Sequence, residues 1–325
     1  MKKLLLTTLS LLMLCSCSTS KTTSKTKMVL DTYCTITLYD SSDTNILEEC
    51  FSLCDEYELI FSMHNSDSEL HKLNHNTNKN NPHNVSDELY EVLLQGYKYS
   101  KLTHGLFDIT IGSVSTLWDF DSNNPSVPTQ ENINNALKHV SYKNIVLDHH
   151  QITYLNQDTM IDLGSNAKGY IADKIKEYLL SQDVHHALIN LGGNILCVGN
   201  KNNENFKIGI DNPKDTSNQI ITLSINDKSV VTSGTYQRCF KVDDTMYHHL
   251  LNPTTGYPMD NDISSVTIIS NDSFMGDTLS TVCFALGKDE GLKLINSLEN
   301  TEACYIDKNN QISYSENFKE YVIKS

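Results

Sequence analysis

The order of apolar and polar residues predicts many short strands and a smaller number of helices. Helical spacing of apolar residues, with Ser or Asp caps in front of some segments, predicts helices at residues 46–61, 68–74, 86–100, 130–139, 167–179, 277–286 and 290–298. Alternating or continuously apolar runs predict strands at residues 29–39, 144–147, 151–154, 159–161, 185–191, 206–210, 220–225, 229–232, 247–251, 263–269, 303–306 and 311–314. Residues 105–112, which lie between two glycines, also read as strand-like.

The distribution of these elements predicts the fold class. Strands outnumber helices in the second half of the chain, and helices do not regularly separate them. This pattern favours an α+β fold over a doubly wound parallel sheet. No internal repeat or strong linker divides residues 28–325, which we expect to form a single domain.

The start of the chain has the organisation of a bacterial lipoprotein signal. Two lysines precede an apolar run over residues 4–14, which is shorter than the roughly 20 residues of a transmembrane helix. Leu14 stands three residues before Cys17, and small Ser16 lies between them, as in a lipobox. We expect a signal peptide over residues 1–16, a lipid on Cys17 and a polar, flexible tether through residue 27. The protein would then sit on the extracytoplasmic face of the membrane; the alternative is an ordinary secreted protein with a nearby cleavage site.

Net charge limits the class of ligand. Removing Lys2 and Lys3 from the 25 basic residues leaves 23 against 40 acidic residues, a formal charge of −17. Such a chain is a poor partner for nucleic acid. An anionic nucleotide would need a metal ion to bridge it to the protein. The seven cysteines beyond Cys17 contain no C-x-x-C pair and suggest no disulfide framework, and Cys50 and Cys54 fit the apolar face of a helix.

Residues 162–173 form the most informative motif. A predicted buried strand ends at residue 161, Gly164 marks a tight turn, and a helix follows. The free N–H groups and the dipole of a helix N-terminus favour anions such as phosphate, and Lys168 would add a positive charge. The alternative is purely structural, with Gly164 making the turn and Gly169 letting the helix pack closely.

Four further segments combine a glycine-containing turn with polar residues able to contact a ligand. They are Gly105–Asp108, Thr232–Arg238, His249–Gly256 and Gly276–Thr281. Each by itself is compatible with an ordinary turn or helix cap, and only their joint occurrence indicates a site.

Together these segments resemble the signatures of the ApbE-type flavin transferases, which are FAD:protein FMN transferases. The resemblance covers essentially all of the chain from Met28 onward, in the family's order. The matching segments are Met28–Thr32, Phe61–Asn74, Gly105–Gly112 with Leu117 and Trp118, Asp162–Asp173, Asn190–Asn194, Thr232–Arg238, His249–Gly256 and Asp277–Thr281. The resemblance implies largely antiparallel sheets with flanking helices, in two closely packed lobes that form an FAD cleft. A lipoprotein signal is also usual in that family.

The resemblance also implies a reaction. In the family, FAD is the substrate and its pyrophosphate lies on a Mg²⁺ ion. The FMN half moves to a Thr or Ser hydroxyl of a target protein, here expected to be an extracytoplasmic redox protein, and AMP is released. Such a site must neutralise phosphate oxygens and remove a proton from a weak nucleophile.

The metal ligands carried over from the family are Asp277, Thr281 and the backbone carbonyl of Ser165, with Ser280 as a weaker candidate. Asp277 and Thr281 are four residues apart on a predicted helix and share a face. Magnesium prefers oxygen ligands and keeps several waters, so few protein ligands suffice. The same oxygen set would also hold Mn²⁺.

The remaining expected site residues contact the nucleotide or move protons. His249 is the candidate acid or base, because an imidazole titrates near neutral pH; the alternative is a histidine satisfied at a strand end. His248 beside it should point to the opposite face. The residues expected to contact FAD are Met28, His64, Leu106, Phe107, Asp108, Asp162, Lys168 and Leu251.

Some positions depart from the family pattern. Ser165 stands where relatives often have Gly, Asn252 replaces a frequent Asp, and His64 lies at a variable position beside the flavin. Two other activities therefore remain open. An FAD pyrophosphatase would release FMN and AMP from the same site, and a flavin-binding lipoprotein would carry FAD without chemistry. Asp277, Thr281 and His249 argue against a carrier, which needs neither a base nor a phosphate-bridging metal.

Overall fold

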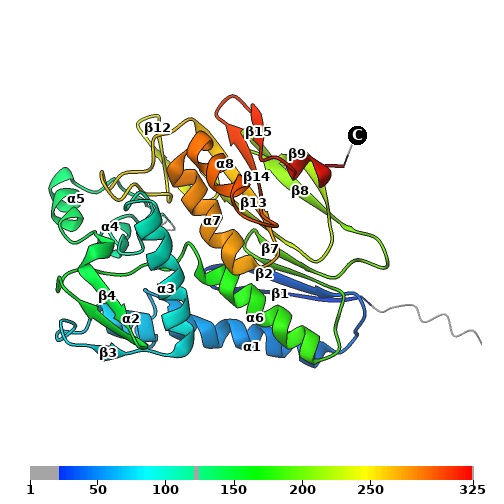
Figure 1. The fold of residues 1–325 in the computed structure, drawn as a ribbon, viewed down its shortest axis with the longest axis horizontal. Helices are drawn as coiled ribbons and strands as arrows, with labels where there is room; N and C mark the ends of the chain where they lie inside the picture. The colour runs from blue at the N-terminus through cyan, green and yellow to red at the C-terminus, as the bar shows by residue number, and fades with distance from the viewer. Residues whose placement is uncertain (1–21, 121–123, 324–325) are drawn as a thin grey trace, which may run out of the picture.

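A long antiparallel sheet runs through the molecule (Figure 1). The computed structural model describes residues 22–120 and 124–323, and within them the sheet has the order β1-β2-β6-β7-β10-β13-β14-β15. These strands are β1 (Thr23–Val29), β2 (Thr32–Leu38), β6 (Ala187–Leu191), β7 (Asn194–Val198), β10 (Ser229–Gly234), β13 (Ile263–Ser270), β14 (Glu302–Asp307) and β15 (Ile312–Tyr314). Every neighbouring pair is antiparallel, which confirms the α+β class.

Helices cover one face of this sheet (Figure 1). They are α1 (Thr44–Phe61), α6 (Ala167–Ser181), α7 (Ser273–Leu286) and α8 (Lys288–Asn296). β2 shows why this face is buried, since its alternate residues Cys34, Ile36 and Leu38 are fully covered. They join the main apolar cluster with Cys50 and Cys54 of α1, which are core residues as the helical spacing predicted.

The opposite face of the sheet is covered near its C-terminal strands by a hairpin (Figure 1). The hairpin consists of β8 (Phe206–Asn212) and β9 (Asp215–Ile225), followed in space by the short helix η2 (Phe318–Glu320). Its apolar residues pack with Cys197, Ile269, Cys304 and Ile306 in a second cluster. The two clusters therefore lie on opposite sides of one sheet.

The rest of the chain forms a smaller helical and hairpin region beside the sheet. It contains α2 (Glu69–Asn74), α3 (Asp87–Leu102), α4 (Gly112–Ser115), α5 (Gln130–Leu137), η1 (Tyr142–Asn144), β3 (His83–Asn84), β4 (Ile145–Asp148), β5 (Gln151–Tyr154), β11 (Cys239–Val242) and β12 (Thr245–His248). A third apolar cluster forms here around Trp118 and Phe240. Ser86 caps α3 by accepting the Leu89 N–H at 3.2 Å, as its position in front of the helix predicted.

Residues 105–112 are not the predicted strand. They form consecutive turns, with Gly105 at a φ of 87°, and α4 begins at Gly112. The Asp108 carboxylate bonds the N–H and hydroxyl of Thr110, which folds the segment back on itself. The apolar pattern correctly predicted that most of this segment is buried. The hydrogen bonds between Asp108 and Thr110 determine its backbone conformation.

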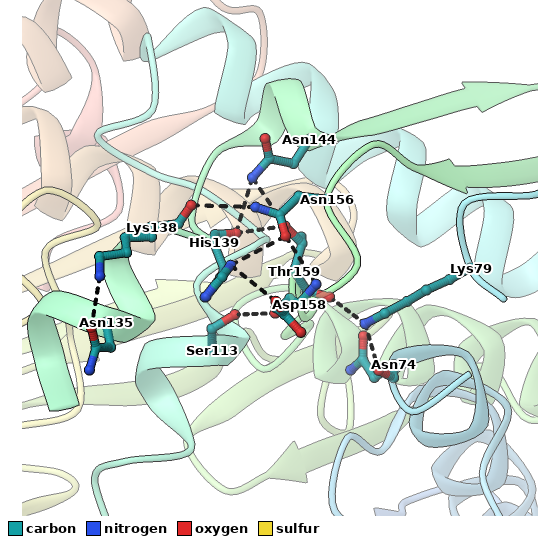
Figure 2. Close-up of polar contacts among 10 residues, drawn as sticks. All are labelled: Asn74, Lys79, Ser113, Asn135, Lys138, His139, Asn144, Asn156, Asp158 and Thr159. Carbon is teal, nitrogen blue, oxygen red and sulfur yellow. Dashed lines mark hydrogen bonds and ion pairs between the residues drawn. The ribbon is translucent and has the colours of Figure 1, made fainter. Parts of the chain in front are cut away.

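The predicted strand at residues 159–161 is also absent, apart from an isolated bridge between Met160 and Ile111. Side chains take the place of a neighbouring strand. Asn74 donates to the Ile161 carbonyl and accepts the Ile161 N–H, each at 2.8 Å. The buried Lys79 ammonium donates to the Thr159 carbonyl at 2.8 Å (Figure 2). Hydrogen bonds from side chains, and not pairing with a strand, therefore hold residues 159–161 in place.

The predicted strand at residues 29–39 is a hairpin. Leu30 and Asp31 both have positive φ and form its two-residue turn. Its first strand, β1, includes residues 23–27, which we had predicted as tether. Thr26 and Thr35 pair their hydroxyls at 2.9 Å across the hairpin, so a polar stretch still forms an edge strand.

The predicted signal peptide and Cys17 lie outside the described residues. Within the residues that are described, no helix is long and apolar enough to cross a membrane.

Candidate active site

A cavity of about 590 Å³ lies where the first and third apolar clusters meet, in the cleft expected between two packed lobes. Its volume falls in the range of about 300–1,000 Å³ that is usual for small-molecule sites. Distant segments of the chain meet around it. The predicted site residues that line it are His64, Leu106, Phe107, Asp108, Asp162, Ser165, Lys168, His249, Leu251, Asp277 and Thr281.

One corner of the cavity is built from the start of α6 and the middle of α7. The Gly169 N–H donates to Oδ2 of Asp277 at 2.8 Å. Gly169 is the third residue of α6, so its N–H is one of the first-turn donors that have no partner within the helix. The Asp277 carboxylate satisfies this donor, and no backbone N–H in the described ranges bonds the carbonyl of Ser165, which precedes the helix. The carbonyl, the carboxylate and the Thr281 side chain all line the same cavity.

Glycine at residue 169 is required by this arrangement. A Cβ there would lie 2.3 Å from the Ser273 carbonyl oxygen and 2.7 Å from the Asp277 Cβ. The two helices therefore approach more closely than any side chain would permit. The close approach brings the α6 backbone within hydrogen-bonding distance of the Asp277 carboxylate.

Burial raises the pKa of Asp277, because its carboxylate is only 6% exposed. The positive charge of Lys168 and the Gly169 N–H oppose that shift by favouring the charged form. A cation bound in the cavity would favour it further.

Thr281 and Ser280 have different surroundings. The Thr281 hydroxyl lies 3.2 Å from the Ser233 hydroxyl and lines the cavity. Ser280 is fully buried and donates to the Asp277 carbonyl at 2.8 Å, and it does not line the cavity. Of the two predicted metal-binding hydroxyls, Thr281 is the one placed to reach a ligand.

This donor set fits a hard divalent cation. A carboxylate, a hydroxyl and an unbonded backbone carbonyl are oxygen ligands of the kind that Mg²⁺ and Mn²⁺ take. In the described part of the chain, no group of three or more His, Cys, Asp or Glu side chains is arranged to hold a metal. We call the three oxygen groups of Ser165, Asp277 and Thr281 the oxygen corner of the cavity. It is suited to an ion that also binds phosphate oxygens and water, and poorly suited to zinc.

Asp162 and Lys168 frame the turn before α6. Asp162 accepts the Gly164 N–H at 2.8 Å and the Ser115 hydroxyl at 2.7 Å, which fixes the turn. The Lys168 ammonium lies 3.4 Å from the Gly164 carbonyl and lines the cavity. Positive charge and the start of a 15-residue helix thus meet at the oxygen corner.

His249 lines the cavity, and only one of its ring nitrogens has a hydrogen-bond partner among the residues that the structure describes. Its Nδ1 lies 3.3 Å from the Arg238 carbonyl oxygen. Because that oxygen can only accept, Nδ1 carries the proton and Nε2 keeps a lone pair. Burial, followed by the charges of Arg238 and Lys168, lowers the pKa of His249 to about 3. The neighbouring His248 is buried against Phe284 on the other side, as predicted.

Comparison with known proteins places this geometry in a family. The sequence profile of the ApbE family matches residues 30–306. The chain belongs to the ApbE family. It is 36% identical over 278 residues to the FAD:protein FMN transferase of Klebsiella pneumoniae, covering 85% of this chain and 86% of that protein. It is 30% identical over 304 residues to the FAD:protein FMN transferase of Treponema pallidum, covering 87% and 84%.

Solved structures agree with this assignment. The ApbE protein of Thermotoga maritima superposes with a TM-score of 0.84 at 30% identity, covering 94% of this chain and all of that one. The flavin transferase ApbE of Vibrio cholerae has the same fold, with a TM-score of 0.83 at 24% identity. The α+β architecture is thus that of solved ApbE structures.

One residue expected to line the ApbE cavity does not. Met28 lies on edge strand β1, is 61% exposed and is not part of the cavity wall. The wall is formed instead by Leu30, Asp31 and Thr32 at the turn of the hairpin. The sequence pattern treated residues 29–39 as one strand and so missed the turn that carries Leu30 inward.

Asp108 lines the ApbE cavity, yet both of its oxygens are bonded within the protein. One accepts from Thr110, and the other accepts the Tyr142 N–H at 2.7 Å. Burial raises the pKa of this carboxylate, while those N–H groups lower it. Asp108 therefore shapes the loop that presents Leu106 and Phe107, which are 44% and 4% exposed.

Several lining residues of the ApbE cavity were not among the predicted site residues, and two of them are unique in the chain. Arg238 is the only arginine in the chain and Trp118 the only tryptophan, and both line the cavity. Their uniqueness, together with their place in the matching segments, was a signal available in the sequence. Trp118 also gives the cavity an intrinsic fluorescent reporter.

Proposed function

We propose that this protein transfers the FMN moiety of FAD to a Thr or Ser hydroxyl of a target protein and releases AMP, in a Mg²⁺-dependent reaction. One observation carries the proposal. Ser165, Asp277 and Thr281 line one nucleotide-sized cavity, where the Gly169 N–H holds the Asp277 carboxylate and no backbone N–H in the described ranges bonds the Ser165 carbonyl. Relatives over most of the chain are named FAD:protein FMN transferase.

The cavity has the surfaces that FAD requires. Phe107 and Trp118 offer apolar and aromatic contacts for the rings of a dinucleotide. Lys168 and the positive end of the α6 dipole offer positive charge for a pyrophosphate. The protein as a whole is acidic, so this local charge is needed for an anionic substrate to bind.

The residues that would hold Mg²⁺ are Asp277, Thr281 and the carbonyl of Ser165. When bound, the ion supplies charge that neutralises pyrophosphate oxygens and stabilises the leaving AMP. Mn²⁺ fits the same ligands. The Asp277 carboxylate is held in place by the Gly169 N–H, so it does not need to reorganise when the ion and substrate arrive.

His249 acts as the base. Its free Nε2 takes the proton of the acceptor hydroxyl as the hydroxyl oxygen bonds the phosphorus of the FMN half. The bond between that phosphorus and the bridging oxygen breaks, and AMP leaves with this oxygen. The products are AMP and an FMN joined to the acceptor through a phosphodiester. His249 is neutral at neutral pH, because its pKa is lowered to about 3.

We further propose that Cys17 carries a lipid and that the enzyme acts on the extracytoplasmic face of the membrane. The support is the signal-like sequence in front of Cys17. The acceptors would then be redox proteins exposed on that side. Labelling with a radioactive fatty acid in a bacterial host, with Cys17→Ser as control, tests the anchor; label on the Cys17→Ser protein would contradict it.

The transferase proposal is tested by incubating the protein with FAD, Mg²⁺ and a flavin-acceptor domain. On a denaturing gel, the acceptor band should become fluorescent, and the Asp277→Ala variant should give no fluorescent band. Release of AMP without a fluorescent acceptor would instead identify an FAD pyrophosphatase.

A further inference from the structure

A second contact between α6 and α7 lies one helical turn away from the Gly169–Asp277 bond. The Asp173 carboxylate of α6 accepts the Ser273 N–H through Oδ1 and the Phe274 N–H through Oδ2, each at 2.8 Å. Residues 169 and 173 share a face of α6, and residues 273 and 277 share a face of α7. Two hydrogen-bonded contacts therefore join the two helices. The cavity lies at the Gly169–Asp277 contact, since Asp277 lines it.

The N-terminus of α7 is capped by two carboxylates, one from its own N-cap residue and one from α6. Asp272 is its own N-cap and accepts the Met275 N–H at 2.8 Å. One such cap is the usual arrangement. The second carboxylate comes from another helix and takes the two remaining N–H groups of the first turn. Asp173 consequently fixes where α7 begins relative to α6.

The Gly169–Asp277 contact does not fix the position of α7 relative to α6 by itself. Gly169 contributes only a backbone N–H, so this contact is a single hydrogen bond to the Asp277 side chain, beside which the rings of Tyr170 and Phe274 pack edge to face with centroids 5.3 Å apart. A bidentate carboxylate that bonds two successive N–H groups defines both the distance and the rotation of the helix it holds. Asp173 does not line the cavity, so it acts through Asp277 and Thr281.

We propose that Asp173 is a positioning residue, which holds the first turn of α7 so that Asp277 and Thr281 face the Ser165 carbonyl at the spacing a divalent cation requires. The inference rests on the proposed function for the identity of the cation. The groups that face the Asp173 carboxylate are the N–H groups of Ser273 and Phe274, with Asp272 and Lys176 as neighbouring charges.

Metal affinity tests the proposal without relying on turnover. Mn²⁺ is titrated in the presence of FAD, and the free ion is followed by electron paramagnetic resonance. Asp173→Asn places an NH₂ group against a backbone N–H and should raise the Mn²⁺ dissociation constant about tenfold, the scale of outer-shell substitutions at metal sites. Quenching of Trp118 by FAD without metal should change less than twofold.

Asp272→Ala is the matched control, because it removes the other carboxylate at the same helix end. It should lower the unfolding temperature about as much as Asp173→Asn while leaving the Mn²⁺ dissociation constant unchanged. Asp173→Glu keeps the charge but displaces the carboxylate by one methylene, so it should weaken Mn²⁺ binding as well. Recovery of wild-type affinity by Asp173→Glu, or equal weakening by Asp272→Ala, would overturn the proposal.

The outcomes separate this proposal from the proposed function. If the wild-type protein binds Mn²⁺ with FAD but neither releases AMP nor labels an acceptor, and Asp173→Asn still weakens Mn²⁺ binding while Asp272→Ala does not, the transferase is wrong and the role of Asp173 stands. If the wild-type protein turns over FAD and Asp173→Asn binds Mn²⁺ as tightly as the wild type, the role of Asp173 is wrong and the transferase stands.

Discussion

At the scale of single residues, the chemistry depends on which group satisfies the Gly169 N–H. A backbone carbonyl can come from any residue type, which explains how Ser165 can stand where relatives often have glycine. The side chain of residue 165 does not need to coordinate anything. What matters is that no backbone N–H in the described ranges bonds this carbonyl, while Asp277 is held in the same cavity by the Gly169 N–H.

Replacing Asp277 should separate catalysis from substrate binding. Asp277→Ala removes the only carboxylate of the oxygen corner, so AMP release from FAD should fall on the order of 100-fold or more, as when one preorganised electrostatic group is lost. The aromatic wall is untouched, and FAD should still quench Trp118. Turnover that persists in metal-free buffer, in either protein, would show that the metal assignment is wrong.

His249 should give the protein a distinct pH dependence of stability. Its pKa is lowered to about 3 in the folded state, below the ordinary value of 6.5. Between these two pH values His249 is protonated in the unfolded chain and neutral in the folded chain. Protonation therefore stabilises the unfolded chain, and the free energy of unfolding decreases as the pH falls from about 6.5 toward 3.

Urea unfolding at pH 7 and pH 5 measures this effect. His249→Asn should lose less unfolding free energy between the two pH values than the wild type, because the residue that takes up the proton on unfolding is gone. An identical pH dependence in both proteins would show that His249 is not held neutral. A separate assay should show that His249→Asn slows FMN transfer at neutral pH.

At the scale of elements, the site is the junction of α6 and α7, and the sequence predicted both helices but not their contact. Hydrophobic spacing locates a helix face, and it does not report that the backbones touch at Gly169. The same limit applies to residues 105–112 and 159–161. Their burial was predicted correctly, but side chains of Asp108, Asn74 and Lys79 hold them in other conformations than a strand.

Gly169→Ala tests the contact between the helices. The added Cβ would overlap the Ser273 carbonyl and the Asp277 Cβ, so the helices must separate, at a cost of about 1–3 kcal/mol in unfolding free energy. The hydrogen bond to Asp277 should break, and the Mg²⁺ concentration for half-maximal AMP release should rise.

Ala172→Gly on the same helix is the control for that experiment. It costs about 1 kcal/mol in helix propensity and also removes a buried methyl group, both without a clash. Its Mg²⁺ requirement should match that of the wild type. If Gly169→Ala loses stability but keeps the wild-type Mg²⁺ requirement, the helix contact does not set the metal site.

At the scale of the whole molecule, the sheet brings together segments that are distant in sequence. β2 pairs with β6, and β7 pairs with β10, so the hairpin turn at Leu30, the start of α6 and the Ser233 segment all reach one cavity. Strand spacing alone predicts the hairpins but not these long-range pairings. The family resemblance predicted most of the residues that meet there, whereas Met28 does not line the cavity, and its contact with FAD stays a prediction.

The most direct test of the account is the ratio of AMP released to flavin bound covalently to an acceptor. The wild-type protein is incubated with FAD, Mg²⁺ and a purified acceptor domain; AMP is measured by chromatography and the acceptor by intact mass. We predict one AMP for each acceptor that gains FMN minus one water, with the added mass on a Thr or Ser. AMP that accumulates at the same rate without any acceptor, while the acceptor mass stays unchanged, would contradict the transferase.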